Sequence, residues 1–479
     1  MLLISAMSAP DASKLAQRTL IAAVATVAGV ALLGGAVWMR RPTAVPIEVS
    51  QQITYIITPT RADGWVDYPE AVDWMRRASL DGGGANAAVP LLRALGRNVL
   101  PAGIDRGAVL KRLGLDDTGV ESPSLQPLRD FVPSGGAAGS EPPAPTMEWL
   151  RARCRAGGGT PISYAAIRAW LEQSDAFLAD LRTASQAASL YIPVARDGRS
   201  EASFDRVNVM RFADAADALA CRAAVSVLQG DGAASWADVD AIWRLGQLVA
   251  RSAGPREYAT AAAFWKTALG ATVDLAASPA TTLELRAAMQ IGLGTKLGFP
   301  PATETLMFHR LAVLDAVGTP LVGKSKRGAP SNGPVARPGT AAKLEAINQQ
   351  FDAIDVAMQG PDPKQRLARL DQAAPAAGQL GVIGRSLLGT EIDGVSAQRL
   401  AAIAVGLATL QRAKGSLPAT LTELGPRAKD PGSGDTFAYA PSGQQFRLHG
   451  VGGDGRDDGG DSAKDVVVIA REPPSPPAP

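Results

Sequence analysis

Residues 210–269, MRFADAADALACRAAVSVLQGDGAASWADVDAIWRLGQLVARSAGPREYATAAAFWKTAL, carry the clearest fold signal of the chain. Apolar residues recur here every three or four positions, as on one face of an α-helix. The first run ends at Gly230, a second passes through Trp243, and Pro255 begins a third. We therefore expect successive helices of about 15 to 20 residues, each with a buried face.

The same spacing extends to both sides of this stretch, over residues 167–181 and 279–289. Because the connections are short, consecutive helices should run antiparallel, which predicts helical hairpins or a small α-solenoid. Trp170, Trp243 and Trp265 are interpreted as core residues of these helices rather than as a ligand-binding box.

Local signals predict where several elements begin. Ile53–Thr58 has the composition of a short strand. Pro69 is suited to the first turn of a helix, and Asn86 to an N-cap. Ser235 followed by Asp238 resembles a capping box at the start of the helix through Trp243.

The composition excludes several classes of function. A net charge of +2 provides no general electrostatic surface for nucleic acid, so no nucleic-acid partner is expected. Two His and two Cys cannot form a multi-histidine zinc site, a four-cysteine site or an iron–sulfur cluster. His309 and His449 are the candidates for histidine-based catalysis, and neither lies in a catalytic motif. The sequence does not determine whether Cys154 and Cys221 pair.

Residues 20–39, LIAAVATVAGVALLGGAVWM, contain no charged side chain and are flanked by cations on both sides. Twenty helical residues span about 30 Å, the thickness of the hydrocarbon core of a bilayer. Trp38 lies at the end of the segment, where an amphipathic ring favours the membrane interface. We predict that this segment is a single transmembrane anchor, inserted in the lipid bilayer.

Two alternatives remain for this segment. Gly34 and Ala36 could precede the cleavage site of a signal peptide, and the segment could also be a buried helix. The flanking cations do not decide the orientation. A signal anchor with most of the chain outside the cytoplasm is the arrangement we expect, with other envelope proteins as partners.

The predicted fold class is mainly α, with an N-terminal transmembrane helix, a helical-hairpin or solenoid-like body and a small C-terminal α+β module with a short antiparallel sheet. Changes in composition divide the chain into a tail (1–19), anchor (20–39), N-terminal helical region (50–132), linker (133–146), helical-hairpin body (147–317), basic Pro/Gly linker (318–340), helical region (341–395), α+β module (396–471) and Pro-rich tail (472–479).

Residues 318–325, GTPLVGKS, match the phosphate-loop pattern GxxxxGK[ST]. A functional phosphate loop requires a preceding strand and a helix directly after it. Here the next residues are KRGAPSNGPVARPG, whose prolines and glycines prevent a continuous helix. We therefore expect no nucleotide binding at this match.

The C-terminal module contains two alternating segments, residues 436–439 and 445–448, and an apolar one, residues 466–469, which predict three short strands beside a helix. A glycine-rich loop before the third strand carries five aspartates: Asp454, Asp457, Asp458, Asp461 and Asp465. Calcium prefers many carboxylate and carbonyl oxygens, so these aspartates are the predicted metal ligands. The alternative is a solvated acidic loop.

Four motifs of this module resemble the C-terminal domain of type II secretion major pseudopilins. They are GxxPxxLxxL at Gly415–Leu424, DPxxG at Asp430–Gly434, FxY at Phe437–Tyr439 and GxDG at Gly452–Gly455. The resemblance covers residues 396–471 and implies a structural calcium near Asp454 and Asp465. The whole chain resembles bacterial proteins that join a membrane anchor and a helical body to such a module, a resemblance that implies no activity.

Three functions are consistent with the sequence. The leading hypothesis is a single-pass envelope protein that acts as a non-enzymatic scaffold, with a calcium-stabilised C-terminal module. The second is a component of a type II secretion or pseudopilus-like apparatus. The third is a hydrolase that uses Asp or Glu side chains in a pocket of the helical body.

Overall fold

The computed structural model describes residues 45–470 apart from 79, 81–82, 101–104, 116–123, 128–164, 194–208, 253, 319–320 and 324–333. The described chain is mainly helical and has a short antiparallel sheet near its C-terminus, which confirms these two parts of the predicted fold class. The predicted anchor (20–39), the linker (133–146), Cys154 and the Pro-rich tail (472–479) lie outside the described residues. Within those residues, no helix combines the length and the apolar character needed to cross a membrane.

The α-helices of the described chain are α2 (Gln51–Thr54), α3 (Tyr68–Arg77), α4 (Ala88–Leu95), α5 (Arg106–Arg112), α7 (Ala165–Ser185), α8 (Val209–Leu228), α9 (Gly232–Ala250), α10 (Pro255–Ala277), α11 (Leu283–Ile291), α12 (Ala302–Gly318), α13 (Thr340–Met358), α14 (Pro363–Ala377) and α15 (Gln379–Lys414). Shorter helical turns are η1 (Arg97–Val99), η3 (Gly292–Lys296) and η4 (Leu421–Ala428). The strands are β1 (Val45–Pro46), β2 (Val322–Gly323), β3 (Val335–Ala336), β4 (Ala438–Ser442), β5 (Gln445–Gly450) and β6 (Val466–Ala470).

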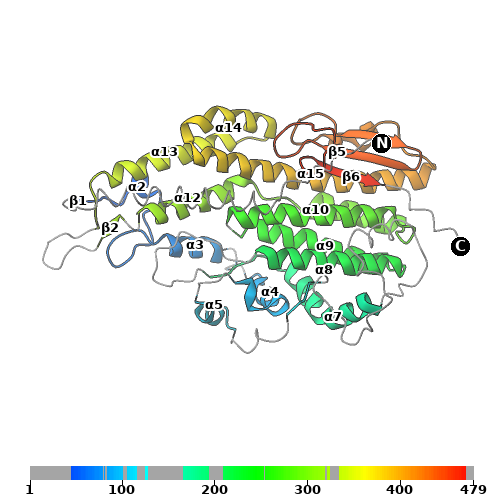
Figure 1. Ribbon diagram of the computed structural model, residues 1–479, viewed down its shortest axis with the longest axis horizontal. Helices are drawn as coiled ribbons and strands as arrows, with labels where there is room; N and C mark the ends of the chain where they lie inside the picture. Colours follow the sequence, from blue (N-terminus) through cyan, green and yellow to red (C-terminus); the bar gives the residue numbers. More distant parts are fainter. Residues whose placement is uncertain are drawn as a thin grey trace, which may run out of the picture.

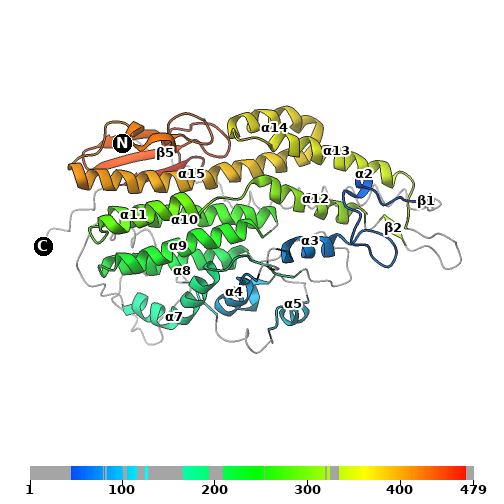
Figure 2. The same cartoon turned by 180° about the vertical axis from the view of Figure 1, so that it is seen from behind.

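The long helix α15 is the element on which the other layers pack (Figure 1). On one side it contacts α10, α11 and α12, and on the other it contacts α13 and α14 along its first half and the C-terminal sheet along its second. Figure 2 shows the same arrangement from behind. The predicted boundary between residues 395 and 396 therefore lies within one continuous helix.

Helices α8, α9 and α10 pack side by side below α15, and α7 and α4 lie beyond them (Figure 1). Asp231 caps α9 by accepting a hydrogen bond from the Ala234 N–H at 2.9 Å. The predicted capping box at Ser235 and Asp238 is therefore wrong, because both residues are inside the helix and buried. The Asp238 carboxylate instead accepts two hydrogen bonds from Arg222 of α8.

The tryptophans of this layer belong to the core, as predicted. Trp170, Trp243 and Trp265 are all buried. The Trp243 and Trp265 rings meet edge to face with centroids 5.0 Å apart, and Trp265 Nε1 donates to the Trp243 carbonyl at 3.0 Å. Gly246 leaves the space for this contact, because a Cβ there would lie 2.4 Å from Trp265 Cδ1.

The substitution Gly246→Ala should therefore destabilise the protein by about 2 kcal/mol, because the added methyl group has to displace a buried indole. Urea unfolding followed by tryptophan fluorescence measures the loss. Gly298→Ala is the matched control, since a Cβ at Gly298 would meet no atom within 4 Å. Equal stability of the two variants would contradict this account of the packing.

The described chain before residue 78 packs on α12 and α13, where Trp65, Tyr68 and Leu311 belong to a second hydrophobic core. The predicted strand Ile53–Thr58 is wrong, because residues 51–54 form the helical turn α2. The Asn348 side chain donates to the carbonyls of Gln52 and Ile53, both at 3.0 Å. These long-range hydrogen bonds stabilise a turn where the apolar composition favours an extended chain.

The C-terminal sheet has the order β4-β5-β6, with all neighbours antiparallel. In the middle of the sheet, Leu448 pairs with Tyr439 on one side and with Val468 on the other. Leu448 and Val468 are buried, as is Phe446 two positions before Leu448. Alternate residues of β5 therefore face the core, and Arg447 and His449 point to the opposite face.

Candidate metal centre

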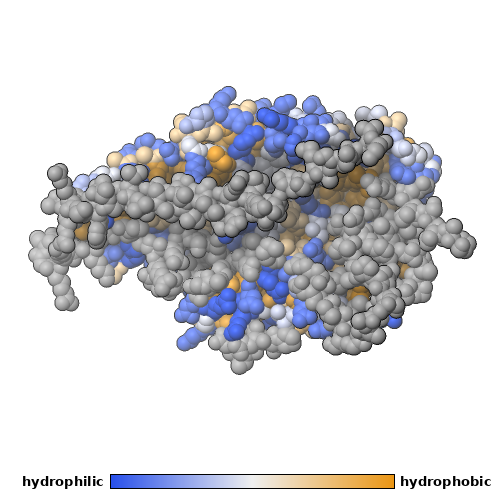
Figure 3. Space-filling view, in the orientation of Figure 1, coloured by the Kyte–Doolittle hydropathy of each residue, from blue (hydrophilic) through white to orange (hydrophobic). Residues whose placement is uncertain are grey.

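Strand pairing places His449 and Asp465 on the same face of the sheet. His449 pairs with Val467, and Asp465 lies two residues before Val467, directly ahead of β6. Side chains two positions apart in a strand share a face, so Asp465 lies toward His449. The loop of residues 451–465, which we call the acidic loop, contacts this face through Arg447 and His449. Figure 3 shows hydrophilic residues on the surface between α14 and the sheet.

Asp465 is the most unusual residue of the acidic loop, because its exposed fraction is only 2%. Its Oδ2 accepts a hydrogen bond from the Gly460 N–H at 2.7 Å. Its Oδ1 is buried and has no hydrogen-bond partner. Burying a carboxylate oxygen without a hydrogen-bond donor costs free energy of folding. A cation bound to Oδ1 would offset this cost.

His449 and Asp457 complete the group around Asp465. One ring nitrogen of His449 and one carboxylate oxygen from each aspartate lie within 4.8 Å of one another. His449 Nε2 is 3.3 Å from Asp457 Oδ1. A hydrogen bond from the Gly459 N–H, followed by the contact with His449, holds the pKa of Asp457 below its usual value. Its ionised form is the form that binds metals.

The other three predicted ligands do not converge with this group. Asp454 accepts a hydrogen bond from the Arg456 N–H, and Asp461 accepts one from the Ala463 N–H. Asp458 forms an ion pair with Lys464 at 3.0 Å. Of the five predicted aspartates, the structure therefore brings together Asp457 and Asp465, and it adds a histidine.

Sequence reasoning missed His449 as a ligand. Its pattern, FRLHG, indicates only the end of a strand. The available signal was the alternation in β5, which places His449 opposite the buried Phe446 and Leu448. The register with β6 then joins it to residues 457–465, and no local pattern specifies that register.

The rest of the module holds the acidic loop against the sheet and α15. Arg447 Nη2 donates to the carbonyls of Gly459 and Gly460 at 2.9 and 2.8 Å. Gly453 lies against the backbone of Gly389 in α15, where a Cβ would be 2.5 Å from a carbonyl oxygen. The site is therefore attached to the helical body through the backbone of the loop.

The DPxxG motif supports the same loop from its other end. Asp430 is buried, and its carboxylate accepts hydrogen bonds from the N–H groups of Gly432 and Val451 at 2.9 and 2.7 Å. Burial raises the pKa of Asp430, while these N–H groups act in the opposite direction. Asp430 is thus a structural residue that holds the first residue of the acidic loop, Val451, and both of its carboxylate oxygens accept hydrogen bonds.

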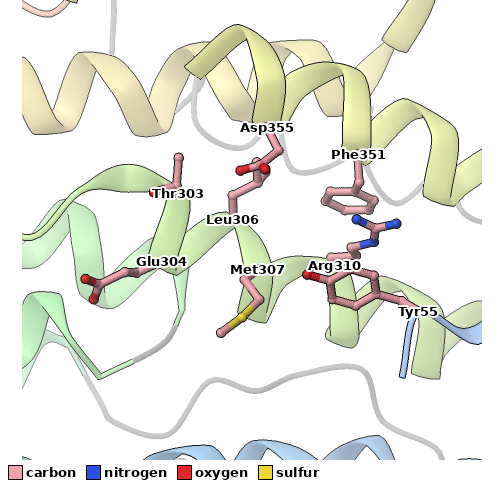
Figure 4. Close-up of a pocket in the computed structure, with 8 residues that line it drawn as sticks. All are labelled: Tyr55, Thr303, Glu304, Leu306, Met307, Arg310, Phe351 and Asp355. Atoms are coloured by element: carbon pink, nitrogen blue, oxygen red, sulfur yellow. The ribbon is translucent and has the colours of Figure 1, made fainter. Parts of the chain in front are cut away.

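A separate cavity of about 290 Å³ lies between α12 and α13 (Figure 4). The guanidinium of Arg310 stacks on Tyr55 with 3.7 Å between its Cζ and the ring centroid. It also donates to Asp352 and Asn348. This cation is fully engaged by protein groups.

The cavity contains two carboxylates, Glu304 and Asp355. Figure 4 shows the Glu304 carboxylate pointing away from Asp355, whose Oδ2 accepts a hydrogen bond from Gln359 at 3.0 Å. The two groups do not form the converging pair that acid–base hydrolysis requires. The cavity therefore does not supply the site expected for a carboxylate hydrolase in the helical body.

The remaining sequence motifs have structural roles where they are described. His309 of α12 is packed edge to face against Phe351, and burial lowers its pKa. Burial also raises the pKa of the free thiol of Cys221 to about 12. Gly318, the first residue of the phosphate-loop match, ends helix α12 and lies against Trp65. A helix thus precedes the match where a phosphate loop requires a strand; Lys324 and Ser325 lie outside the described residues.

No protein-family model matches this chain, and no curated protein or solved structure is detectably similar to it.

Proposed function

We propose that this protein is a non-enzymatic scaffold whose C-terminal module is stabilised by a divalent metal ion bound to His449, Asp457 and Asp465. The observation that carries the proposal is the buried side chain of Asp465, whose Oδ1 has no hydrogen-bond partner and which belongs to a group of three residues with converging donors. The ion would join the acidic loop to strands β5 and β6. It would thereby order the surface that the module presents beside α14.

The scaffold part of the proposal follows from the helical layers and from the sequence. Helices α8 to α10 and α13 to α15 form stacked layers with short connections, an architecture that offers extended surfaces for partners. The predicted anchor at residues 20–39 would hold these surfaces beside a membrane, and envelope proteins would be their partners. Calcium is the ion that the acidic sequence predicts, and the module resembles that of secretion pseudopilins.

Divalent ions should raise the melting temperature of the full-length protein after it has been stripped with a chelator. An ion that binds only the folded chain stabilises it by about 2.7 kcal/mol at one hundred times its dissociation constant. Thermal unfolding with increasing calcium, magnesium, manganese or zinc measures the effect. If none of these ions stabilises the stripped protein, the proposal fails.

Three variants locate the site. Asp465→Asn should abolish the stabilisation, because it removes the charge of the buried ligand while keeping an acceptor for the Gly460 N–H. Asp457→Asn tests the site at an exposed position, where the fold is not at risk. Asp461→Asn is the matched control in the same loop, and it should retain the response of the native protein to metal.

A further inference from the structure

We infer that this site selects a transition metal of the zinc class over calcium. The inference rests on the proposed metal site and specifies which ion the site takes. Its first support is the imidazole of His449, since ring nitrogen is a preferred donor for zinc, copper, iron and nickel, whereas calcium is bound by oxygen. His449 is on strand β5, so its position is set by the sheet rather than by a flexible loop.

The second support is the shortage of oxygen donors. Calcium binds about six to eight oxygens, and a glycine-rich loop commonly supplies backbone carbonyls. Here the carbonyls of Gly459 and Gly460 already accept hydrogen bonds from Arg447. The Asp461 carbonyl accepts hydrogen bonds from the N–H groups of Lys464 and Asp465. Three carbonyls of the acidic loop that could contribute to a calcium shell are thus already hydrogen-bonded within the protein.

The group of converging donors contains two of the aspartates of the acidic loop. It consists of His449, Asp457 and Asp465, and the side chains of Asp454, Asp458 and Asp461 do not belong to it. Asp458 instead pairs with Lys464. The group is a three-ligand set, which leaves one position of a tetrahedral ion for water.

The separation of two donors also fits a small tetrahedral ion. Zinc binds imidazole nitrogen and carboxylate oxygen at about 2.0 to 2.2 Å, which places two ligands of a tetrahedron about 3.3 Å apart. His449 Nε2 and Asp457 Oδ1 are 3.3 Å apart. The Asp457 side chain is 57% exposed, so an ion can reach this group from solvent.

The buried Asp465 oxygen separates this group from an ordinary acidic loop. The Asp465 side chain is almost entirely inaccessible to solvent, and its Oδ1 has no hydrogen-bond partner. One of its two carboxylate oxygens lies within 4.8 Å of the donor atoms of His449 and Asp457. A cation bound between the three side chains would neutralise a carboxylate that water does not reach. An exposed, hydrated acidic cluster has no such requirement.

Competition on the stripped full-length protein tests the ion class. We expect zinc to bind at least about 100-fold more tightly than calcium, and excess calcium to leave bound zinc in place. Cobalt(II) should substitute for zinc and give the intense visible absorption of a tetrahedral site. Calcium binding more tightly than zinc would overturn the inference and leave the proposed metal site standing, whereas binding of neither ion would remove both.

The two histidines of the chain provide a matched pair of variants. His449→Gln should weaken zinc binding about 100-fold and abolish the tetrahedral cobalt spectrum. His309→Gln should change neither, because His309 packs against Phe351 in helix α12. Zinc binding that survives His449→Gln would overturn the inference, and a metal response lost on Asp465→Asn but not on His449→Gln would indicate an oxygen-only site.

Discussion

The substitution Arg222→Met should lower the free energy of unfolding by about 3 to 5 kcal/mol, the usual cost of leaving a buried charge without its partner. Arg222 Nε and Nη2 donate to the two oxygens of Asp238 at 2.8 and 2.6 Å. Asp238 has an exposed fraction of 1%, and a second cation, Arg182, is 3.8 Å away with about half of its side chain exposed. Methionine fills a similar volume but leaves this carboxylate without its bidentate donor.

The loss in Arg222→Met should depend on pH. Burial raises the pKa of Asp238, and Arg222 opposes that shift, so the pKa should rise further without Arg222. The folded variant then binds a proton more tightly than the unfolded chain. Its unfolding free energy falls as the pH rises from about 4, the unfolded value, through the folded pKa. The destabilisation should therefore be smaller at pH 4 than at pH 7.

The double variant Arg222→Met with Asp238→Leu is the control for charge burial. Replacing both members of a buried pair with apolar residues is often neutral, so this variant should regain most of the lost stability. Urea unfolding of the native protein, the two single variants and the double variant gives the four free energies of the cycle at each pH. If the double variant is as unstable as the single one, packing rather than the orphaned charge is responsible.

The substitution Glu391→Gln should also cost about 3 kcal/mol, because Glu391 connects three helices. Its Oε1 accepts a hydrogen bond from the guanidinium of Arg366 in α14. Its Oε2 accepts one from the N–H of Ala302, the first residue of α12, at 2.7 Å. Glu391 is itself on α15 and is buried, as is Arg366. Glutamine keeps the acceptor for Ala302 but leaves Arg366 without a counter-charge.

The matched control is the ion pair between Asp371 and Arg385, which joins the same helices α14 and α15 at the surface. Asp371→Asn should change the stability by about 1 kcal/mol or less, since water screens an exposed pair. Urea unfolding compares the two variants, and hydrogen exchange should show faster opening of the first turn of α12 only in Glu391→Gln. Similar losses in both variants would refute the role assigned to burial.

The positions of the helices could be read from local patterns. Periodic apolar residues, together with residues that begin or end helices such as Pro255 and Gly230, locate α8, α9 and α10 to within a few residues. The alternating segments around Phe446 and Leu448 likewise indicate β5. These elements depend on interactions between residues that are close in the sequence, so the local pattern of residues is enough to predict them.

Charged residues were harder to interpret, because their roles depend on distant contacts. Asp238 has the spacing of a capping residue, yet it pairs with Arg222 on the preceding helix. Residues 53–58 have a strand-like composition, yet Asn348 stabilises a helical turn there. In both cases a partner far away in the sequence outweighs a local preference of about 1 kcal/mol or less.

The amino-acid sequence alone thus specified a mainly helical chain, its breaks, a small C-terminal sheet and an acidic loop, because periodicity, caps and glycines act over a few residues. Three-dimensional packing was needed to select Asp457 and Asp465 from five aspartates and to join them to His449. The physical reason is that strand register and loop closure, rather than spacing along the chain, set which donors meet and which oxygen is buried without a partner.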